Sequence, residues 1–150
     1  MTEQEFCVEG TCLCGQVRFR VRGRPLLTLA CHCTGCQRLT ASAFGLAVLY
    51  PVGSLDITDG EPVIGALHGA DRQFFCPYCM SWLYTVPAGL GFIAVRATML
   101  DNARSFRPFL EVHTGEKLPW ATTPAVHSFE TLPPPEELSR LVAEFGALEG

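Results

Sequence analysis

Eight cysteines are the feature that most constrains this 150-residue chain, because seven of them fall into three short groups. The groups are Cys12-Leu13-Cys14, Cys31-His32-Cys33-Thr34-Gly35-Cys36 and Cys76-Pro77-Tyr78-Cys79. A zinc ion takes about four soft ligands in a tetrahedron, and a closely spaced cysteine pair supplies half of them. The two pairs together would complete one closed site, whereas the group of three would leave a fourth position open. Closed zinc sites are generally structural and open ones catalytic.

Spacing alone leaves other assignments of the cysteines open. Cys33 and Cys36 could instead join Cys76 and Cys79 in one site. Disulfides are disfavoured because residues 1–5 lack the basic and apolar regions of a secretory signal, so we expect a cytoplasmic, reducing location. Iron–sulfur ligation would require different spacings. A redox-active Cys-x-x-Cys pair would be expected at a strand-to-helix turn, whereas this pair lies between two predicted strands.

The group of three cysteines has a distinct electrostatic character. Three thiolates on a divalent zinc ion leave an excess of negative charge, so the centre is a weaker Lewis acid than one held by neutral histidines. Such a centre favours holding a substrate thiol as the thiolate, which is the nucleophilic form, over generating hydroxide. The sequence therefore predicts a reaction that makes or breaks a C–S bond, with Cys31, Cys33 and Cys36 as catalytic metal ligands.

Apolar periodicity predicts a mainly β domain. Val17, Phe19 and Val21 alternate with polar residues over residues 16–21, which indicates a half-buried strand. Turn residues at spacings typical of all-β domains separate the other predicted strands, which are residues 44–50, 54–58, 72–75, 82–86 and 91–95. We expect these strands to form small, mostly antiparallel sheets.

The C-terminal residues 133–150 predict a proline-led helix. Its apolar residues recur at helical spacing and are Leu138, Leu141, Val142 and Phe145. Pro135 suits the first turn of this helix, and Gly146 suits its end. We expect the apolar stripe to pack on the rest of the domain, and a helix that binds a partner is the alternative.

Composition and charge narrow the classes of protein further. The chain is 48% hydrophobic and 17% charged, which excludes disorder, and its length suits one domain. Its formal net charge of −4 argues against a nucleic-acid partner. Residues 113–119 look like the linker between zinc fingers, but they lack the cysteine pair that a finger needs about 12 residues before its first histidine. No stretch approaches the roughly 20 apolar residues that cross a bilayer, so we expect no membrane partner.

The cysteine groups and their neighbours also resemble a known family. The chain carries, in order, GTCLCGQVRF (residues 10–19), CHCTGCQ (31–37), FCPYC (75–79) and LPW (118–120). These motifs are similar to those of the glutathione-dependent formaldehyde-activating enzyme family, which also contains the centromere protein V domain. The resemblance spans most of the chain.

This resemblance implies a fold, a metal content and an activity. It implies a β-tent fold of small sheets around zinc knuckles over residues 10–132, preceded by an N-terminal tail (1–9) and followed by the helix (133–150). It implies two Zn²⁺ ions, with a structural zinc on Cys12, Cys14, Cys76 and Cys79 and a labile, catalytic-type zinc on Cys31, Cys33 and Cys36. It also implies carbon–sulfur lyase activity like that of S-(hydroxymethyl)glutathione synthase, with a glutathione-like thiol and an aldehyde such as formaldehyde as small-molecule partners.

Met80 departs from the family pattern, which commonly has glycine after the last cysteine. A glycine there permits a positive φ, so we expect Met80 either to accept strain or to sit in a differently shaped turn.

Two residues beside the group of three are further candidates for the site. Arg38 can neutralise the anionic centre or bind a substrate carboxylate, although a solvated surface arginine is an equal alternative. His32 is expected to point away from the metal and to support its neighbours by hydrogen bonds. Cys7 has no partner by sequence and is expected to be an inert thiol.

Two other functions stay open from the sequence. The first is a non-enzymatic, zinc-stabilised module that binds a protein, and the second is a redox-responsive thiol switch. The sequence does not indicate an oligomeric state.

Overall fold

The computed structural model describes residues 6–149, which form eleven strands in two sheets and two α-helices. The prediction of a mainly β chain with a C-terminal helix is confirmed. Contacts divide the chain into two compact units, each built from two separate stretches. The first unit contains the residues up to Pro25 and Leu49–Phe106, and the second contains Leu26–Val48 and the residues from Arg107 onward.

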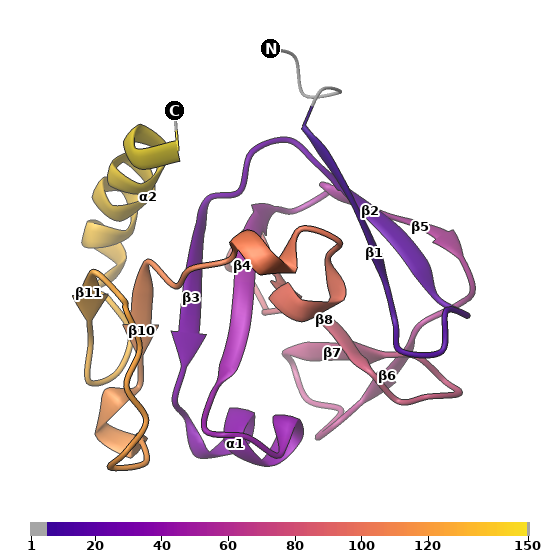
Figure 1. The fold of residues 1–150 in the computed structure, drawn as a ribbon, viewed down its shortest axis with the longest axis horizontal. Coiled ribbons are helices and arrows are strands. Elements are labelled where there is room, and N and C mark those ends of the chain that lie inside the picture. The colour runs from indigo at the N-terminus through magenta and orange to yellow at the C-terminus, as the bar shows by residue number, and fades with distance from the viewer. Residues whose placement is uncertain (1–5, 150) are drawn as a thin grey trace. The chain divides into compact units, whose positions relative to one another are not determined.

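In the first unit, the pairs β1–β2, β2–β5, β6–β7, β7–β8 and β8–β9 are antiparallel (Figure 1). One sheet has the order β1-β2-β5, and the other contributes the run β9-β8-β7-β6. The strands are β1 (Cys7–Thr11), β2 (Arg18–Arg22), β5 (Leu55–Asp59), β6 (Val63–Gly65), β7 (Arg72–Phe75), β8 (Trp82–Val86) and β9 (Phe92–Arg96). Two 3-10 helices follow, η2 (Ala97–Met99) and η3 (Ala103–Ser105).

Strand β2 shows the alternation that the sequence predicts. Val17, Phe19 and Val21 are at most 1% exposed, whereas Arg18 and Arg20 between them are exposed. Because successive side chains of a strand point to opposite faces, these three apolar residues form one buried face.

The sequence predicts no strand in residues 1–9, the segment expected to be a tail. The structure instead has strand β1, whose pairing with β2 begins at Cys7. Residues 1–5 of that predicted tail lie outside the described residues. Gly10 of β1 lies opposite Phe19 of β2, and a Cβ atom at Gly10 would approach Phe19 Cζ to 2.4 Å. The Phe19 ring therefore lies directly against the backbone of Gly10 and fills the space that a side chain at residue 10 would need.

The second unit contains parallel strands. Its strand order is β11-β10-β3-β4, and β10 runs parallel to both β3 and β11, which the antiparallel prediction did not anticipate. Its elements are β3 (Leu27–Cys31), α1 (Thr34–Thr40), β4 (Gly45–Pro51, whose last residues belong to the first unit), β10 (Leu110–Val112), η4 (Thr114–Glu116), β11 (His127–Ser128) and α2 (Pro135–Glu149).

Helix α2 packs within the second unit, as its apolar stripe predicts. Leu141 and Phe145 are buried, and the Phe145 ring meets the Phe109 ring edge-on at a centroid distance of 5.5 Å. The helix begins at Pro135 as expected but continues through Gly146 to Glu149, so the predicted end at Gly146 is wrong. A helical glycine costs only about 1 kcal/mol relative to alanine, which is not enough to stop a helix that is held by tertiary packing.

Among the described residues, no helix combines the length and the apolar character needed to cross a bilayer.

The contact between Gly10 and Phe19 gives a direct test of this fold. Gly10→Ala should lower the free energy of unfolding by about 1–3 kcal/mol, because the added methyl group would overlap the buried ring. In a chain of this size, that loss lowers the thermal midpoint by about 2–4 °C per kcal/mol. Gly69→Ala is the matched control, because a Cβ atom there meets no neighbour within 4 Å. Equal midpoints for the two variants, measured by circular dichroism, would contradict the pairing of β1 with β2.

Candidate metal centres

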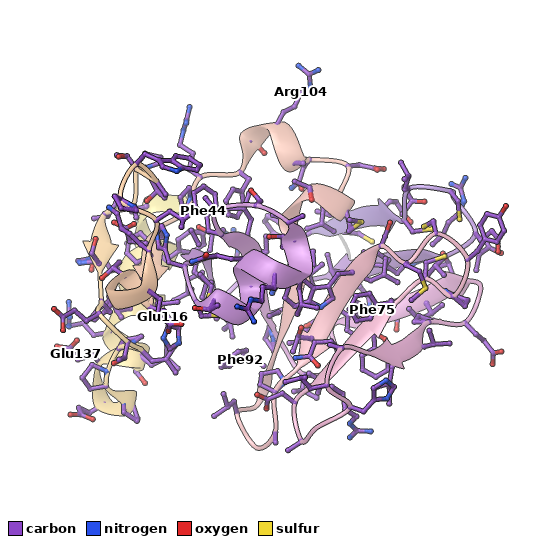
Figure 2. All side chains as sticks on the ribbon, turned by 90° about the horizontal axis from the view of Figure 1, so that it is seen from below. Phe44, Phe75, Phe92, Arg104, Glu116 and Glu137 are labelled. Atoms are coloured by element: carbon purple, nitrogen blue, oxygen red, sulfur yellow. The ribbon has the colours of Figure 1, made fainter. Side chains whose placement is uncertain are left out.

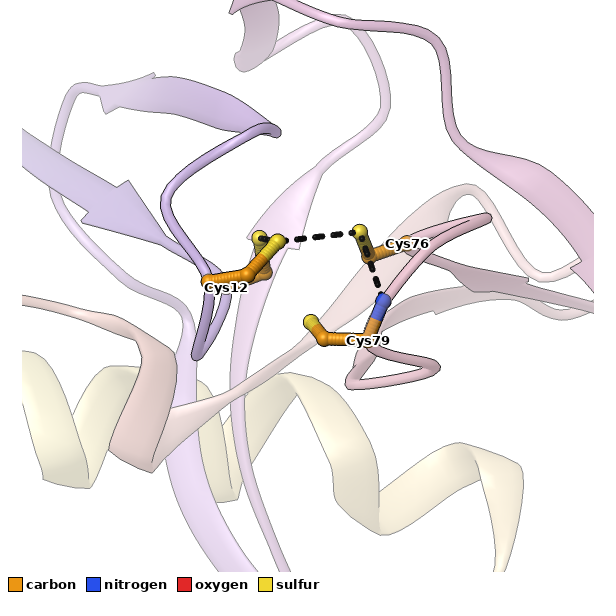
Figure 3. Close-up of side chains that lie close together, drawn as sticks. Cys12, Cys76 and Cys79 are labelled. Atoms are coloured by element: carbon orange, nitrogen blue, oxygen red, sulfur yellow. Dashed lines mark hydrogen bonds between the residues drawn. The ribbon is translucent and has the colours of Figure 1, made fainter.

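Four cysteines from two turns of the first unit form one group. Cys12 and Cys14 lie after β1, while Cys76 and Cys79 lie between β7 and β8; Figure 3 shows the two turns facing each other. The four sulfurs lie within 4.8 Å of one another, and the Sγ atom of Cys14 is 3.6 Å from that of Cys12 and 3.7 Å from that of Cys76. Tetrahedral Zn–S bonds of about 2.3 Å place sulfurs about 3.8 Å apart. The donor set and its spacing therefore fit a zinc ion.

Backbone amides surround these sulfurs with donors. The Val17 N–H donates to Cys12 Sγ at 3.3 Å, and the N–H groups of Tyr78 and Cys79 both donate to Cys76 Sγ at 3.4 Å. Figure 3 shows the bond from Cys79. Hydrogen bonds to the charged form of a group favour that form. Burial opposes ionisation of Cys12, but hydrogen bonds, first that from Val17, lower the pKa of its thiol. The Gln16 N–H lowers the pKa of Cys14, but burial and the neighbouring cysteines raise it to about 11.

Ser81 connects the two turns of this group. Its hydroxyl accepts the Leu13 N–H at 3.1 Å and lies 3.2 Å from Cys79 Sγ, to which it can donate. Burial opposes ionisation of Cys79, but the hydrogen bonds from Ser81 lower the pKa of this thiol to about 5. One serine therefore holds the turns together and supports a thiolate.

Met80 adopts the left-handed conformation that glycine would favour, with φ of 59°. Its N–H donates to the Cys76 carbonyl at 3.0 Å, which closes the turn. The Met80 side chain is 57% exposed, so little burial offsets the conformational cost. Of the two outcomes expected from the sequence, the structure has the first, a turn of ordinary shape with a strained residue.

The other three cysteines form a second group within the second unit. Cys31 ends β3, Cys33 is the N-cap of α1, and Cys36 lies in the first helical turn. Their sulfurs also lie within 4.8 Å of one another, and among the described residues no fourth Cys, His, Asp or Glu joins them. The structure thus groups the two pairs together and these three apart, rather than placing Cys33 and Cys36 with Cys76 and Cys79.

The three thiols of this group oppose one another's ionisation. Hydrogen bonds from Cys31 and then from Cys36 lower the pKa of Cys33, whereas the contact with Cys33 raises the pKa of Cys31, and the contacts with Cys31 and then Cys33 raise that of Cys36. A divalent soft cation would stabilise three thiolates at this spacing and leave one negative charge in excess.

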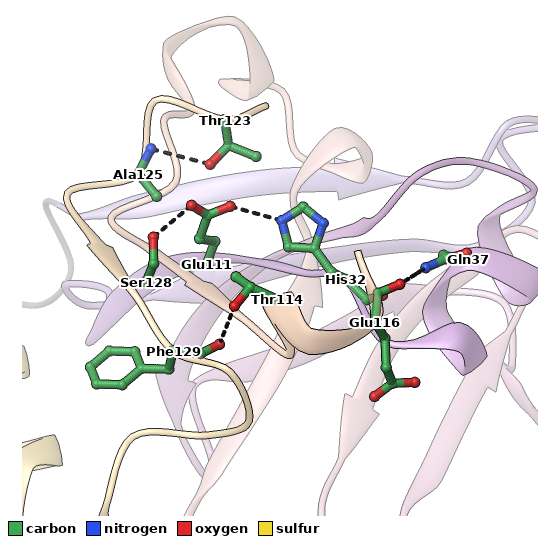
Figure 4. A network of polar contacts seen from close by, with 9 residues as sticks. All are labelled: His32, Gln37, Glu111, Thr114, Glu116, Thr123, Ala125, Ser128 and Phe129. Atoms are coloured by element: carbon green, nitrogen blue, oxygen red, sulfur yellow. Dashed lines mark hydrogen bonds and ion pairs between the residues drawn. The ribbon is translucent and has the colours of Figure 1, made fainter. Parts of the chain in front are cut away.

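His32 points away from the sulfurs on either side of it, as the alternation of an extended segment requires. Its ring is fully buried, and Nε2 lies 2.8 Å from Oε1 of Glu111 on β10, while the Ser128 hydroxyl donates to Oε2 at 2.6 Å (Figure 4). Burial would raise the pKa of Glu111, but the hydrogen bonds from Ser128 and His32 lower it. A carboxylate thus anchors the residue between two of the sulfurs.

A second set of contacts comes from residues 113–116, which lie in the segment whose sequence is similar to a zinc-finger linker. Glu116 accepts hydrogen bonds from Thr34, and its carbonyl accepts from Gln37 (Figure 4). The N–H and hydroxyl of Thr34 lower the pKa of Glu116. No local pattern could have indicated this contact, because Thr34 and Glu116 are 82 positions apart.

Arg38 and Cys7 both lie at the surface. Arg38 is exposed on α1 and makes no hydrogen bond or ion pair with any described residue, so its proposed role stays a prediction. Cys7 is exposed on β1, and all eight cysteines, which are among the described residues, are free thiols.

Comparisons with known proteins relate these groups to a family. The family model described as glutathione-dependent formaldehyde-activating enzyme matches residues 7–116, which include both cysteine groups. A crystal structure of a Rhodobacter sphaeroides protein, a structural genomics target, is similar with a TM-score of 0.52 and 20% sequence identity. That match covers 62% of this chain and 87% of the other, and at this identity it shows the fold alone. A comparison with curated proteins gave no match.

The four-cysteine group should stabilise the fold through its metal. Cys76→Ser should lose the zinc bound there and abolish the cooperative thermal transition of the first unit, because the free energy of binding a structural metal is free energy of folding. The control is Cys7→Ser, which replaces an exposed cysteine outside both groups. A Cys76→Ser protein that melts like Cys7→Ser, with the same zinc content by elemental analysis, would rule out a structural zinc.

The strain at Met80 should be measurable. Met80→Gly should raise the free energy of unfolding by about 1 kcal/mol, because the left-handed conformation is costly for a residue with a Cβ atom. Leu13→Gly is the control in the facing turn, because Leu13 is also exposed but lacks a positive φ. This control should be destabilising by about 0.5–1 kcal/mol. Denaturant unfolding would refute the strain if the two substitutions changed stability in the same direction.

Proposed function

Because the chain belongs to the glutathione-dependent formaldehyde-activating enzyme family, we propose that it is a zinc-dependent enzyme of the carbon–sulfur lyase type. The proposed substrates are a small, glutathione-like thiol and an aldehyde such as formaldehyde. The family match supports this proposal because it extends over residues 7–116 of 150 and includes all seven grouped cysteines.

The two cysteine groups have different proposed roles. The four cysteines that surround one point would hold a structural zinc, because they leave no ligand position open; they are Cys12, Cys14, Cys76 and Cys79. Cys31, Cys33 and Cys36 would hold a catalytic-type zinc. The observation that carries the proposal is the gathering of these three sulfurs with no fourth protein ligand among the described residues.

A zinc ion on the group of three would supply a fourth position at which a substrate thiol can lose its proton. In the net reaction, a bond forms between the thiol sulfur and the carbonyl carbon, and the π-electron pair of the carbonyl moves to oxygen. The proton of the thiol ends on that oxygen, and nothing is oxidised or reduced. The reverse reaction breaks the C–S bond and returns the proton to sulfur.

The chain itself would position the reacting groups. Cys33 Sγ is fixed by the Cys36 N–H at 3.2 Å, and the buried His32–Glu111 pair holds the segment between the first two ligands. Such positioning converts a bimolecular step into an effectively unimolecular one. Arg38, exposed on the same helix as Cys36, is the proposed partner for a carboxylate of the thiol substrate.

We also propose that the protein is located in the cytoplasm, which is a reducing compartment. Free thiolates at two centres require conditions in which disulfides do not form.

A single substitution separates the enzyme from a passive zinc module. Cys33→Ser should lose the second zinc and the acceleration of exchange between glutathione and its hydroxymethyl adduct, measured by exchange NMR with ¹³C-formaldehyde. The fold should persist, because the four-cysteine group is unchanged, and Cys7→Ser should keep both metal and activity. If Cys33→Ser accelerated the exchange as well as the wild type, the assignment of the reaction to this group would be wrong. Wild-type protein that loads two zinc ions without any acceleration would support an interaction module instead.

A further inference from the structure

The N-terminus of helix α1 carries two of the three cysteines of the second group, Cys33 and Cys36. Its N-cap is Cys33, whose sulfur accepts the Cys36 N–H, and no acidic residue lies in its first turn. The first N–H groups of a helix have no partner within the helix. The helix spans only Thr34–Thr40, so its own hydrogen bonds contribute little to holding the turn between the second and third ligands.

Glu116 supplies the missing acceptor from a distant part of the chain. Its Oε1 atom accepts the Thr34 N–H at 3.0 Å and the Thr34 hydroxyl at 2.9 Å. Thr34 follows the ligand Cys33 directly, so both bonds act on the residue next to a sulfur. Figure 2 shows Glu116 beside the short helix.

The loop that carries Glu116 is itself held in place. His113 Nδ1 lies 3.6 Å from the other carboxylate oxygen of Glu116. The N–H groups of His113, Thr114 and Gly115 donate to the carbonyls of the segment 129–131, at 2.8, 3.1 and 3.3 Å. The loop and the contact with His113 therefore hold the Glu116 carboxylate in position to accept the hydrogen bonds from Thr34.

A second contact joins the loop 113–116 to the segment that carries the three cysteines. The Gln37 side-chain amide donates to the Glu116 carbonyl at 3.0 Å and to the His32 carbonyl at 2.8 Å (Figure 4). Gln37 follows the third ligand, and His32 lies between the first two. The loop thus contacts the ligand segment at Thr34 and at Gln37, and Gln37 in turn binds His32 on the other side of Cys33.

We propose that Glu116 is a positioning residue for the three-cysteine centre, which holds the Cys33–Cys36 turn in its metal-binding geometry through its two hydrogen bonds to Thr34. This inference rests on the proposed function, in which the centre holds a metal ion. It predicts that the acceptor oxygen, rather than the negative charge, is what the centre requires. Losing such an outer hydrogen bond typically weakens metal binding by about 10- to 100-fold.

The test measures Co²⁺ binding to the full chain by the thiolate-to-cobalt absorption band, with Cys33→Ser used to assign the spectrum of the four-cysteine group. Glu116→Ala should weaken binding at the three-cysteine centre by about 10- to 100-fold and leave the other centre unchanged. Glu116→Gln carries the same charge as Glu116→Ala but keeps an acceptor oxygen, so it should bind as the wild type does. Glu130→Ala is the control for loss of an acidic residue, because Glu130 is exposed on the adjoining segment 129–131 and makes no side-chain hydrogen bond with a described residue.

Thr34→Val tests the partner of this contact, because it removes the hydroxyl and keeps the N–H. It should weaken binding less than Glu116→Ala does, and it should add nothing in the Glu116→Ala background.

Two results would overturn this inference alone. If Glu116→Ala lowered only the thermal midpoint and left the Co²⁺ dissociation constant of the folded protein unchanged, Glu116 would be merely structural. If Glu116→Gln weakened binding as much as Glu116→Ala, charge and not the acceptor would be the requirement. Wild-type protein whose three-cysteine centre takes up no Co²⁺ would instead overturn the proposed function and this inference together.

Discussion

The convergence of soft sulfur donors is the constraint on which the rest of this structure depends. Cys14 and Cys76 are 62 positions apart, yet their sulfurs lie 3.7 Å from each other. Thiolates at such a distance repel one another unless a cation lies between them. A metal ion at this point would tie the turn after β1 to the turn after β7, and thereby one sheet of the first unit to the other. The small, glycine-lined core at Gly10 and Phe19 would then need to supply only part of the stability of that unit.

The two centres are built in opposite ways. The four-cysteine group takes its ligands from distant pairs and its support from nearby backbone amides, such as those of Val17 and Cys79. The three-cysteine group takes its ligands from one segment of six residues and its support from distant side chains, Glu111 and Glu116. The arrangement of the three-cysteine group would suit a metal centre with one open ligand position, because Glu111 and Glu116 are outside the set of metal ligands and leave that position free.

Much of this could be predicted from the sequence, and the failures have physical causes. Strict alternation identified β2, and close spacing identified the three cysteine clusters, because each pattern is local. Spacing left open how the clusters combine, and the structure joins the two distant pairs into one group. Strands β3 and β10 were missed because they pair in parallel, which leaves no hairpin turn to recognise, and because β10 has only three residues. Helix α1 was missed because its N-cap is a cysteine and its first acidic partner, Glu116, is remote in sequence. Strain at Met80 was one of the two outcomes expected, because the resembled family commonly has glycine at that position, and the φ of 59° agrees with it.

The most direct test of the account is the zinc content of the purified, untagged chain by native mass spectrometry, before and after exposure to a small competing thiol. The account predicts two zinc ions per chain that fall to one, with the remaining ion on the closed centre. Protein prepared with ample zinc that contains none, or whose Cys31, Cys33 and Cys36 are linked as disulfides, would contradict it.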